Sequence, residues 1–90
     1  MIIFRTSDAT HDILTWDGQV LEHFGGESSR RVHVGVLTNI AVNTNRHNTH
    51  ELTLKTVVGS VLSILIDEKG LAKANELVAE VQKAMTSLNI

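Results

Sequence analysis

Histidines are the residues of this chain whose type and spacing come nearest to suggesting chemistry. His47 and His50 are separated by two residues and are followed by Glu51, which makes them the tightest group of potential metal ligands. Neutral imidazoles bind zinc, but histidine pairs in zinc sites usually have about three to five intervening residues and need further ligands. The other histidines, His11, His23 and His33, lie far away in the sequence. Because residues 43–50 include no apolar side chain, the alternative is a solvated loop that leads into a strand, and the spacing favours the loop.

Other catalytic patterns are missing from the sequence. The chain has no cysteine, which excludes thiolate catalysis and thiolate metal ligands. Gly59 and Ser60 lack the frame of a Gly-x-Ser-x-Gly nucleophile turn. The glycine-rich segment 25–29 lacks the Gly-Lys-Ser/Thr ending of a phosphate-binding loop and precedes a predicted strand. We therefore expect a protein that is not an enzyme and needs no cofactor. The alternative is a small enzyme or metal-binding protein that uses His47 and His50.

Composition and charge narrow the class of protein. The 90 residues are 42% hydrophobic, and 8 Lys and Arg against 10 Asp and Glu give a net charge of −2. Proteins that bind nucleic acid or a membrane surface normally carry a basic face. No apolar run approaches the roughly 20 residues of a membrane helix. We expect one domain over residues 1–90, located in the cytoplasm, that binds neither nucleic acid nor membranes.

Alternating apolar residues predict about seven short strands over the first two thirds of the chain. Asp17 and Gly18 stand between two strand-like runs, which is typical of a hairpin with a type I′ turn. Val32, Val34 and Val36 alternate with polar residues or glycine, which predicts a half-buried strand. The expected strands cover residues 2–5, 13–16, 19–24, 31–36, 38–43, 52–55 and 61–66.

The last third of the chain predicts one amphipathic helix of about five turns, roughly residues 68–88. Apolar residues recur there at spacings of three and four, which places them on one face of a helix. Asp67 is the expected N-cap. Gly70 is a poor residue for a first helical turn, so a start at Leu71 is the alternative.

This order of elements predicts an α+β fold: seven short antiparallel strands in a bent sheet or partial barrel, closed by the C-terminal helix. It resembles the plan of pleckstrin-homology-like (PH-like) domains. Residues 31–42 look like the middle of small bacterial PH-like proteins, where a basic-aliphatic run leads one strand into the next. Two features depart from that pattern: His33 stands where proline is frequent, and the helix has no tryptophan.

The resemblance raises the question of phosphoinositide binding, which PH domains perform with clustered Lys and Arg near the first inter-strand loop. The corresponding loop here, residues 6–11, contains Asp8 and no Lys or Arg. Clustered cations are needed to hold phosphates, so we expect no binding to phosphoinositides.

What remains is a non-enzymatic module for protein interaction or self-assembly, which would add a strand to a sheet edge or seat a peptide beside the helix. Trp16 is either a packing residue or an anchor for a partner. The strand 61–66 is apolar on both faces, and Val61 and Leu65 point away from its core-facing residues. We expect this surplus face to form a symmetric dimer or a small ring, unless the helix covers it.

Overall fold

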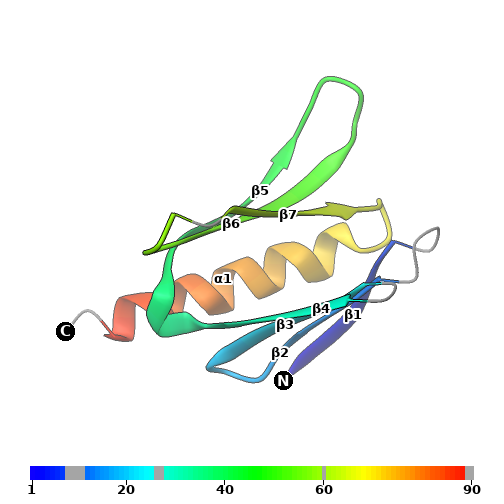
Figure 1. The fold of residues 1–90 in the computed structure, drawn as a ribbon. Coiled ribbons are helices and arrows are strands. Elements are labelled where there is room, and N and C mark those ends of the chain that lie inside the picture. Colours follow the sequence, from blue (N-terminus) through cyan, green and yellow to red (C-terminus); the bar gives the residue numbers. More distant parts are fainter. Residues whose placement is uncertain (8–11, 26–27, 60, 89–90) are drawn as a thin grey trace.

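The computed structural model describes residues 1–7, 12–25, 28–59 and 61–88, with the side chains of residues 7, 28, 61 and 88 excepted. It is an α+β fold of seven antiparallel strands in two sheets and one C-terminal helix (Figure 1). The predicted strand number, strand direction and helix are therefore confirmed. The acidic loop position Asp8, on which the argument about phosphoinositides rests, lies outside the described residues, as does Ser60.

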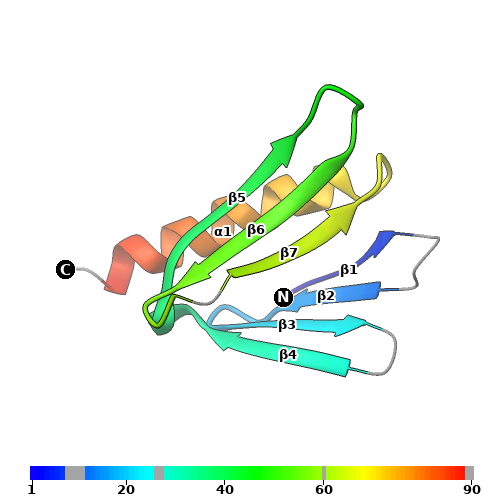
Figure 2. The same cartoon turned by 45° about the horizontal axis from the view of Figure 1, so that its top comes forward.

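The first sheet contains four strands in the order β1-β2-β3-β4. They are β1 (Ile2–Ser7), β2 (Asp12–Trp16), β3 (Val20–Gly25) and β4 (Ser28–His33). Each strand pairs with its sequence neighbour, as short connections between antiparallel strands require. As a result, β4 ends the sheet and leaves one of its sides without a partner strand among the described residues (Figure 2).

The predicted hairpin between β2 and β3 forms, but its turn is not type I′. The turn is closed by a hydrogen bond from the Asp17 N–H to the Val20 carbonyl, so Gly18 and Gln19 lie at its centre. A type I′ turn needs positive φ at both central residues, whereas only Gly18, at φ 104°, has it here. The Asp17 carboxylate accepts hydrogen bonds from the N–H groups of Gln19 (2.9 Å) and Val20 (2.8 Å).

The second sheet contains β5 (Leu37–Thr44), β6 (His50–Thr56) and β7 (Val61–Ile66) in the order β5-β6-β7. A 3-10 turn, η1 (Val34–Val36), separates it from β4. The sequence had predicted one strand through to Val36, which is wrong, because β4 ends at His33. Of the predicted bent sheet or partial barrel, the structure shows two separate sheets. The Gly35 N–H donates to the His33 ring at Nδ1 (2.9 Å), which turns the chain sharply and begins a separate sheet.

The helix α1 (Leu71–Leu88) begins at the later of the two predicted starts. Asp67 lies between β7 and α1. Its carboxylate accepts a hydrogen bond from the Gly70 N–H (2.8 Å), and its own N–H donates to the Thr6 carbonyl (2.8 Å). A β-carbon at Gly70 would lie 3.2 Å from the Arg5 carbonyl oxygen. Glycine therefore allows the helix to approach β1 closely.

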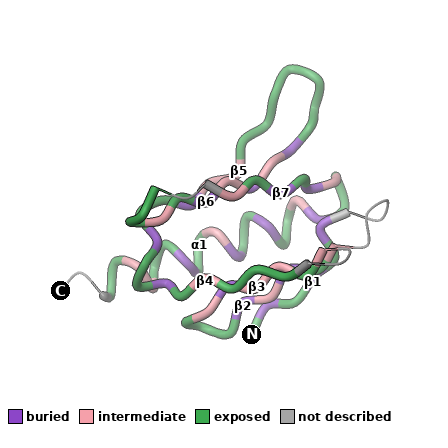
Figure 3. Tube along the Cα trace, viewed as in Figure 1, coloured by how far each residue is buried: buried purple, intermediate pink, exposed green. Residues whose placement is uncertain are grey.

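The core lies between the two sheets and α1, which occupies the opening between them (Figures 1 and 3). Ala74, Leu77 and Val81 form the fully buried stripe of the helix. They pack against apolar side chains from every strand of the second sheet and most of the first. β1 lies beside β7, but the described strands do not join into a closed barrel. Within the described residues, no helix has the length and apolarity to cross a membrane.

Candidate functional site

His50 is held in the interior at the start of β6. It is 5% exposed, and both of its ring nitrogens have partners. The Thr44 hydroxyl lies 2.8 Å from Nδ1, and a Glu68 carboxylate oxygen lies 3.0 Å from Nε2. The ring therefore connects the end of β5 to the segment before α1. A histidine that is hydrogen-bonded at both ring nitrogens links these two segments.

His47, the predicted second metal ligand, lies exposed in the loop between β5 and β6. Its N–H and that of Thr49 both donate to the Asn45 side chain, at 2.9 and 3.0 Å, so Asn45 organises the loop. A metal at His50 would have to displace Thr44 or Glu68 from the ring. The described residues include no group of three or more potential metal ligands. The metal role of the pair stays a prediction, and this geometry does not favour it.

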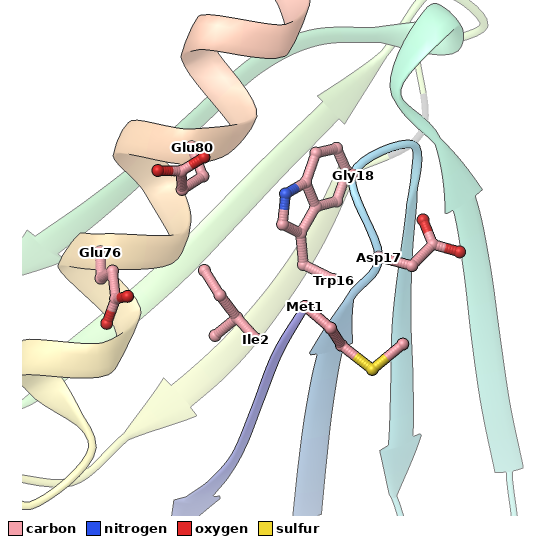
Figure 4. Close-up of a pocket in the computed structure, with 7 residues that line it drawn as sticks. All are labelled: Met1, Ile2, Trp16, Asp17, Gly18, Glu76 and Glu80. Carbon is pink, nitrogen blue, oxygen red and sulfur yellow. The ribbon is translucent and has the colours of Figure 1, made fainter.

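Trp16, the predicted partner anchor, lies at the end of β2 and is 4% exposed. Its indole faces α1 from beside the β2–β3 turn, at a pocket of about 310 Å³ (Figure 4). Glu76 and Glu80 of the helix also line that pocket, whereas the Asp17 carboxylate points away from the helix. Because the chain itself covers the ring, its packing role is plain, and its role as an anchor stays a prediction.

Leu65 lies on the outer face of β7 and is 55% exposed, while Ile64 and Ile66 are buried. The predicted alternation of this strand is therefore observed, and α1 does not cover Leu65. Its cross-strand neighbour is Glu51, and its neighbour on the same face of β7 is Ser63. The side chain of Val61 lies outside the described residues. These two neighbours are polar, and self-association through Leu65 stays a prediction.

A large apolar depression lies along the free side of β4. It has a volume of about 670 Å³, and we call it the β4 groove. Its apolar lining comes from four valines on three different elements: Val32, Val36, Val57 and Val58. The N–H of Val57 donates to the Val36 carbonyl (2.9 Å), which fixes the β6–β7 turn against η1. Val57 and Val58 are 64% and 81% exposed, an unusual position for two consecutive valines.

Backbone groups of β4 that have no partner among the described residues lie next to this apolar surface. The Val34 N–H donates to the Gln19 carbonyl (2.7 Å) across the pair of strands, and His33 lies opposite Val20. In an antiparallel pair, successive residues alternate between bonding the partner strand and pointing away from it. The N–H and C=O groups of Arg31 and His33 therefore point toward the free side of β4. Such an edge is a template for a further strand.

Basic side chains surround the β4 groove. Arg30, Arg31 and His33 all line it. Arg31 contacts Glu22 of β3 at 3.2 Å and keeps a side chain that is 72% exposed. His33 accepts the Gly35 N–H at Nδ1, so the neutral ring carries its proton on Nε2 and can donate it to a ligand. The site thus combines hydrogen-bonding backbone, an apolar floor and positive charge.

Sequence reasoning missed this site. Adjacent strand residues such as Arg30 and Arg31 point to opposite faces of a strand, so alternation gives no reason to group them. That alternation holds within a sheet, but the β4 groove follows the free edge, where side chains from both faces reach it. The available signal was the pair Val57 and Val58 directly before Gly59, since consecutive valines are rare in an exposed turn.

Comparison of the chain with protein-family models, with curated proteins and with solved structures finds no match.

Proposed function

We propose that this chain is a non-enzymatic protein-interaction module of PH-like architecture, which binds an extended segment of a partner along β4. The single observation that carries the proposal is the free edge of β4 beside the β4 groove. Peptides that add a strand to a sheet gain affinity from backbone hydrogen bonds and specificity from side-chain pockets. Both kinds of contact are available here within one strand length. The arrangement of four strands, three strands and a C-terminal helix supports the PH-like part of the proposal.

We favour a binding function over a catalytic one because the residues around His50 do not form a complete catalytic site. A hydroxyl, an imidazole and a carboxylate do lie in series there, as Thr44, His50 and Glu68. Acyl transfer also needs N–H donors directed at the developing oxyanion. The nearby loop N–H groups of His47 and Thr49 are already donated to Asn45. The series therefore suits a structural junction better than a reaction centre.

The proposal is tested with a display library of random decapeptides selected on the full chain, and with two variants of one residue. Arg31→Pro removes the N–H that points to the free side of β4, and proline is tolerated on edge strands. Arg31→Gln removes the same charge and keeps the N–H, so it is the matched control. Circular dichroism verifies that both variants keep the helix signal.

We expect selected peptides to bind Arg31→Pro at least tenfold more weakly than Arg31→Gln. The reason is that one backbone hydrogen bond to an added strand is lost and the neighbouring ones are misaligned. Equal binding to the two variants would show that no strand is added at β4. A library that yields no binder above background would equally contradict the proposal.

A further inference from the structure

The charges around the β4 groove select among the extended segments that β4 can accept. Arg30, Arg31 and Val32 are consecutive, so the residues opposite them on an added strand are consecutive as well. An antiparallel partner places one residue directly opposite each of the three positions, in the order Val32, Arg31, Arg30 along the partner. Opposite charges directly across a strand pair are favourable, and like charges are unfavourable. A partner therefore gains from two adjacent acidic residues next to an apolar one.

The two arginines are available for such contacts. Arg31 shares its guanidinium with Glu22, but that group has five N–H donors and its side chain is mostly exposed. Arg30 is exposed and lines the groove. Arginine holds carboxylates in a planar, bidentate geometry, which adds orientation to charge. His33 provides a further donor at Nε2 for a third acceptor on the same partner.

A second copy of this chain is a poor occupant of the groove. Two β4 strands paired antiparallel about a twofold axis at Arg30 or Arg31 would bring that arginine against its own copy, which is unfavourable. The sequence has a single pair of adjacent acidic residues, Asp67 and Glu68. Asp67 accepts the Gly70 N–H, and Glu68 is hydrogen-bonded to His50. Neither carboxylate is free to leave its site without loss of the contacts that begin α1.

We infer that the partner of the β4 groove is an extended segment of a different protein, in which an apolar residue adjoins two consecutive acidic residues. The apolar side chain packs on Val32, Val36, Val57 and Val58, and the two carboxylates meet Arg30 and Arg31. This inference rests on the proposed function, because it takes strand addition at β4 as given and adds the chemistry of the strand.

The test is a nuclear magnetic resonance titration of the labelled full chain with three synthetic decapeptides. They share one background of serine, threonine and valine and differ only in a central Leu-Glu-Glu, Leu-Gln-Gln or Leu-Lys-Lys. Each exposed ion pair contributes roughly 1.5- to 5-fold in affinity. With two pairs, we expect the acidic peptide to bind about tenfold more tightly than the glutamine peptide, and the lysine peptide to bind most weakly. The advantage should shrink as salt screens the charges.

Variants assign the preference to the groove. Arg30→Gln and Arg31→Gln should each reduce the advantage of the acidic peptide about threefold, in line with one exposed ion pair. Arg46→Gln removes an equal charge from the exposed β5–β6 loop and should change nothing. The amide signals that move should be those of Arg31 and His33.

Failure of the inference differs from failure of the proposed function. If all three peptides shift the β4 signals with equal affinity, strand addition stands and the acidic partner is refuted. If Arg46→Gln reduces the preference as much as Arg31→Gln, the effect comes from total charge and the inference is likewise refuted. If no peptide shifts the β4 signals, or the shifts lie elsewhere, both the inference and the proposed function are wrong.

Discussion

Replacement of Trp16 by alanine tests whether this residue stabilises the core. Only 4% of Trp16 is exposed. A side chain of this size removes up to about 250 Å² from water, which corresponds to an upper bound of about 6 kcal/mol. Measured Trp→Ala changes in protein cores cost about 3–5 kcal/mol. A domain of this length has a total stability of roughly 5–13 kcal/mol, so we expect Trp16→Ala to leave a marginal fold.

The assay is urea unfolding followed by far-ultraviolet circular dichroism, because the variant lacks the chain's one tryptophan. We expect the free energy of unfolding to fall by about 4 kcal/mol, which corresponds to a fall in Tm of roughly 20 °C. Phe24→Ala is the matched control: Phe24 is an aromatic residue of the same sheet that is 42% exposed, and its loss should cost about 1 kcal/mol. If Trp16→Ala costs no more than Phe24→Ala, the ring does not stabilise the core, and the reasoning from burial is refuted.

Three further predictions concern single side chains. The buried Thr56 hydroxyl has no hydrogen-bond partner among the described residues, so Thr56→Val should raise the free energy of unfolding by about 1 kcal/mol. If urea unfolding shows a lower free energy of unfolding instead, the hydroxyl has a hydrogen-bond partner in the folded protein. His50→Leu should change the free energy of unfolding by no more than about 1 kcal/mol, because the polar groups of Thr44 and Glu68 are exposed and can hydrogen-bond to water instead. If the same variant loses peptide binding at β4, His50 belongs to the binding site. Hydrogen bonds from the Val20 and Gln19 N–H groups lower the pKa of Asp17 below its ordinary 3.8, so its ionised form stabilises the fold above that pH and this contribution is lost as pH falls through the lowered pKa. Thermal melts of Asp17→Asn from neutral to acidic pH should therefore differ from the wild type at neutral pH and converge with it at low pH, and a constant difference would contradict this.

The sequence was sufficient to predict elements whose patterns are local. The helix follows from an apolar repeat that needs no knowledge of the rest of the chain, and its buried stripe of Ala74, Leu77 and Val81 lies on the predicted face. The strands follow for the same reason, including β7 with Ile64 and Ile66 inward and Leu65 outward. The PH-like family itself stays a prediction.

The division into two sheets depended on a contact that alternation does not reveal. Val32, Val34 and Val36 fit a strand pattern, yet Val36 is 42% exposed and belongs to a 3-10 turn. The turn forms because the His33 ring accepts the Gly35 N–H, a bond between a side chain and the backbone. Such local bonds compete with strand pairing, and an apolar period of two contains no information about them.

The candidate site was beyond sequence reasoning because it joins segments that only the fold brings together. Arg31 and Val57 are 26 positions apart in the sequence, and both line the β4 groove. His47 and His50 show the opposite case: they are close in sequence, but one is exposed in a loop and the other is buried. Proximity in sequence therefore suggested a site at His47 and His50, whose side chains lie apart. It gave no indication of the β4 groove, whose lining residues are distant in sequence.

The same arginines that define the partner also protect the free edge of β4. An exposed edge strand invites pairing with any other strand, and charged side chains are a common means of preventing this. Arg30 and Arg31 oppose pairing of β4 with its own copy, since a twofold axis at either residue brings that arginine against a like charge. An acidic segment reverses the sign of that interaction and turns the repulsive feature into an attractive one. Specificity of this kind comes from what the edge rejects as much as from what it binds.

The double variant Arg30→Gln, Arg31→Gln should therefore lose its preference for acidic peptides and begin to self-associate at high concentration, which light scattering would detect. A double variant that stays monomeric at every concentration would show that the arginines do not protect this edge.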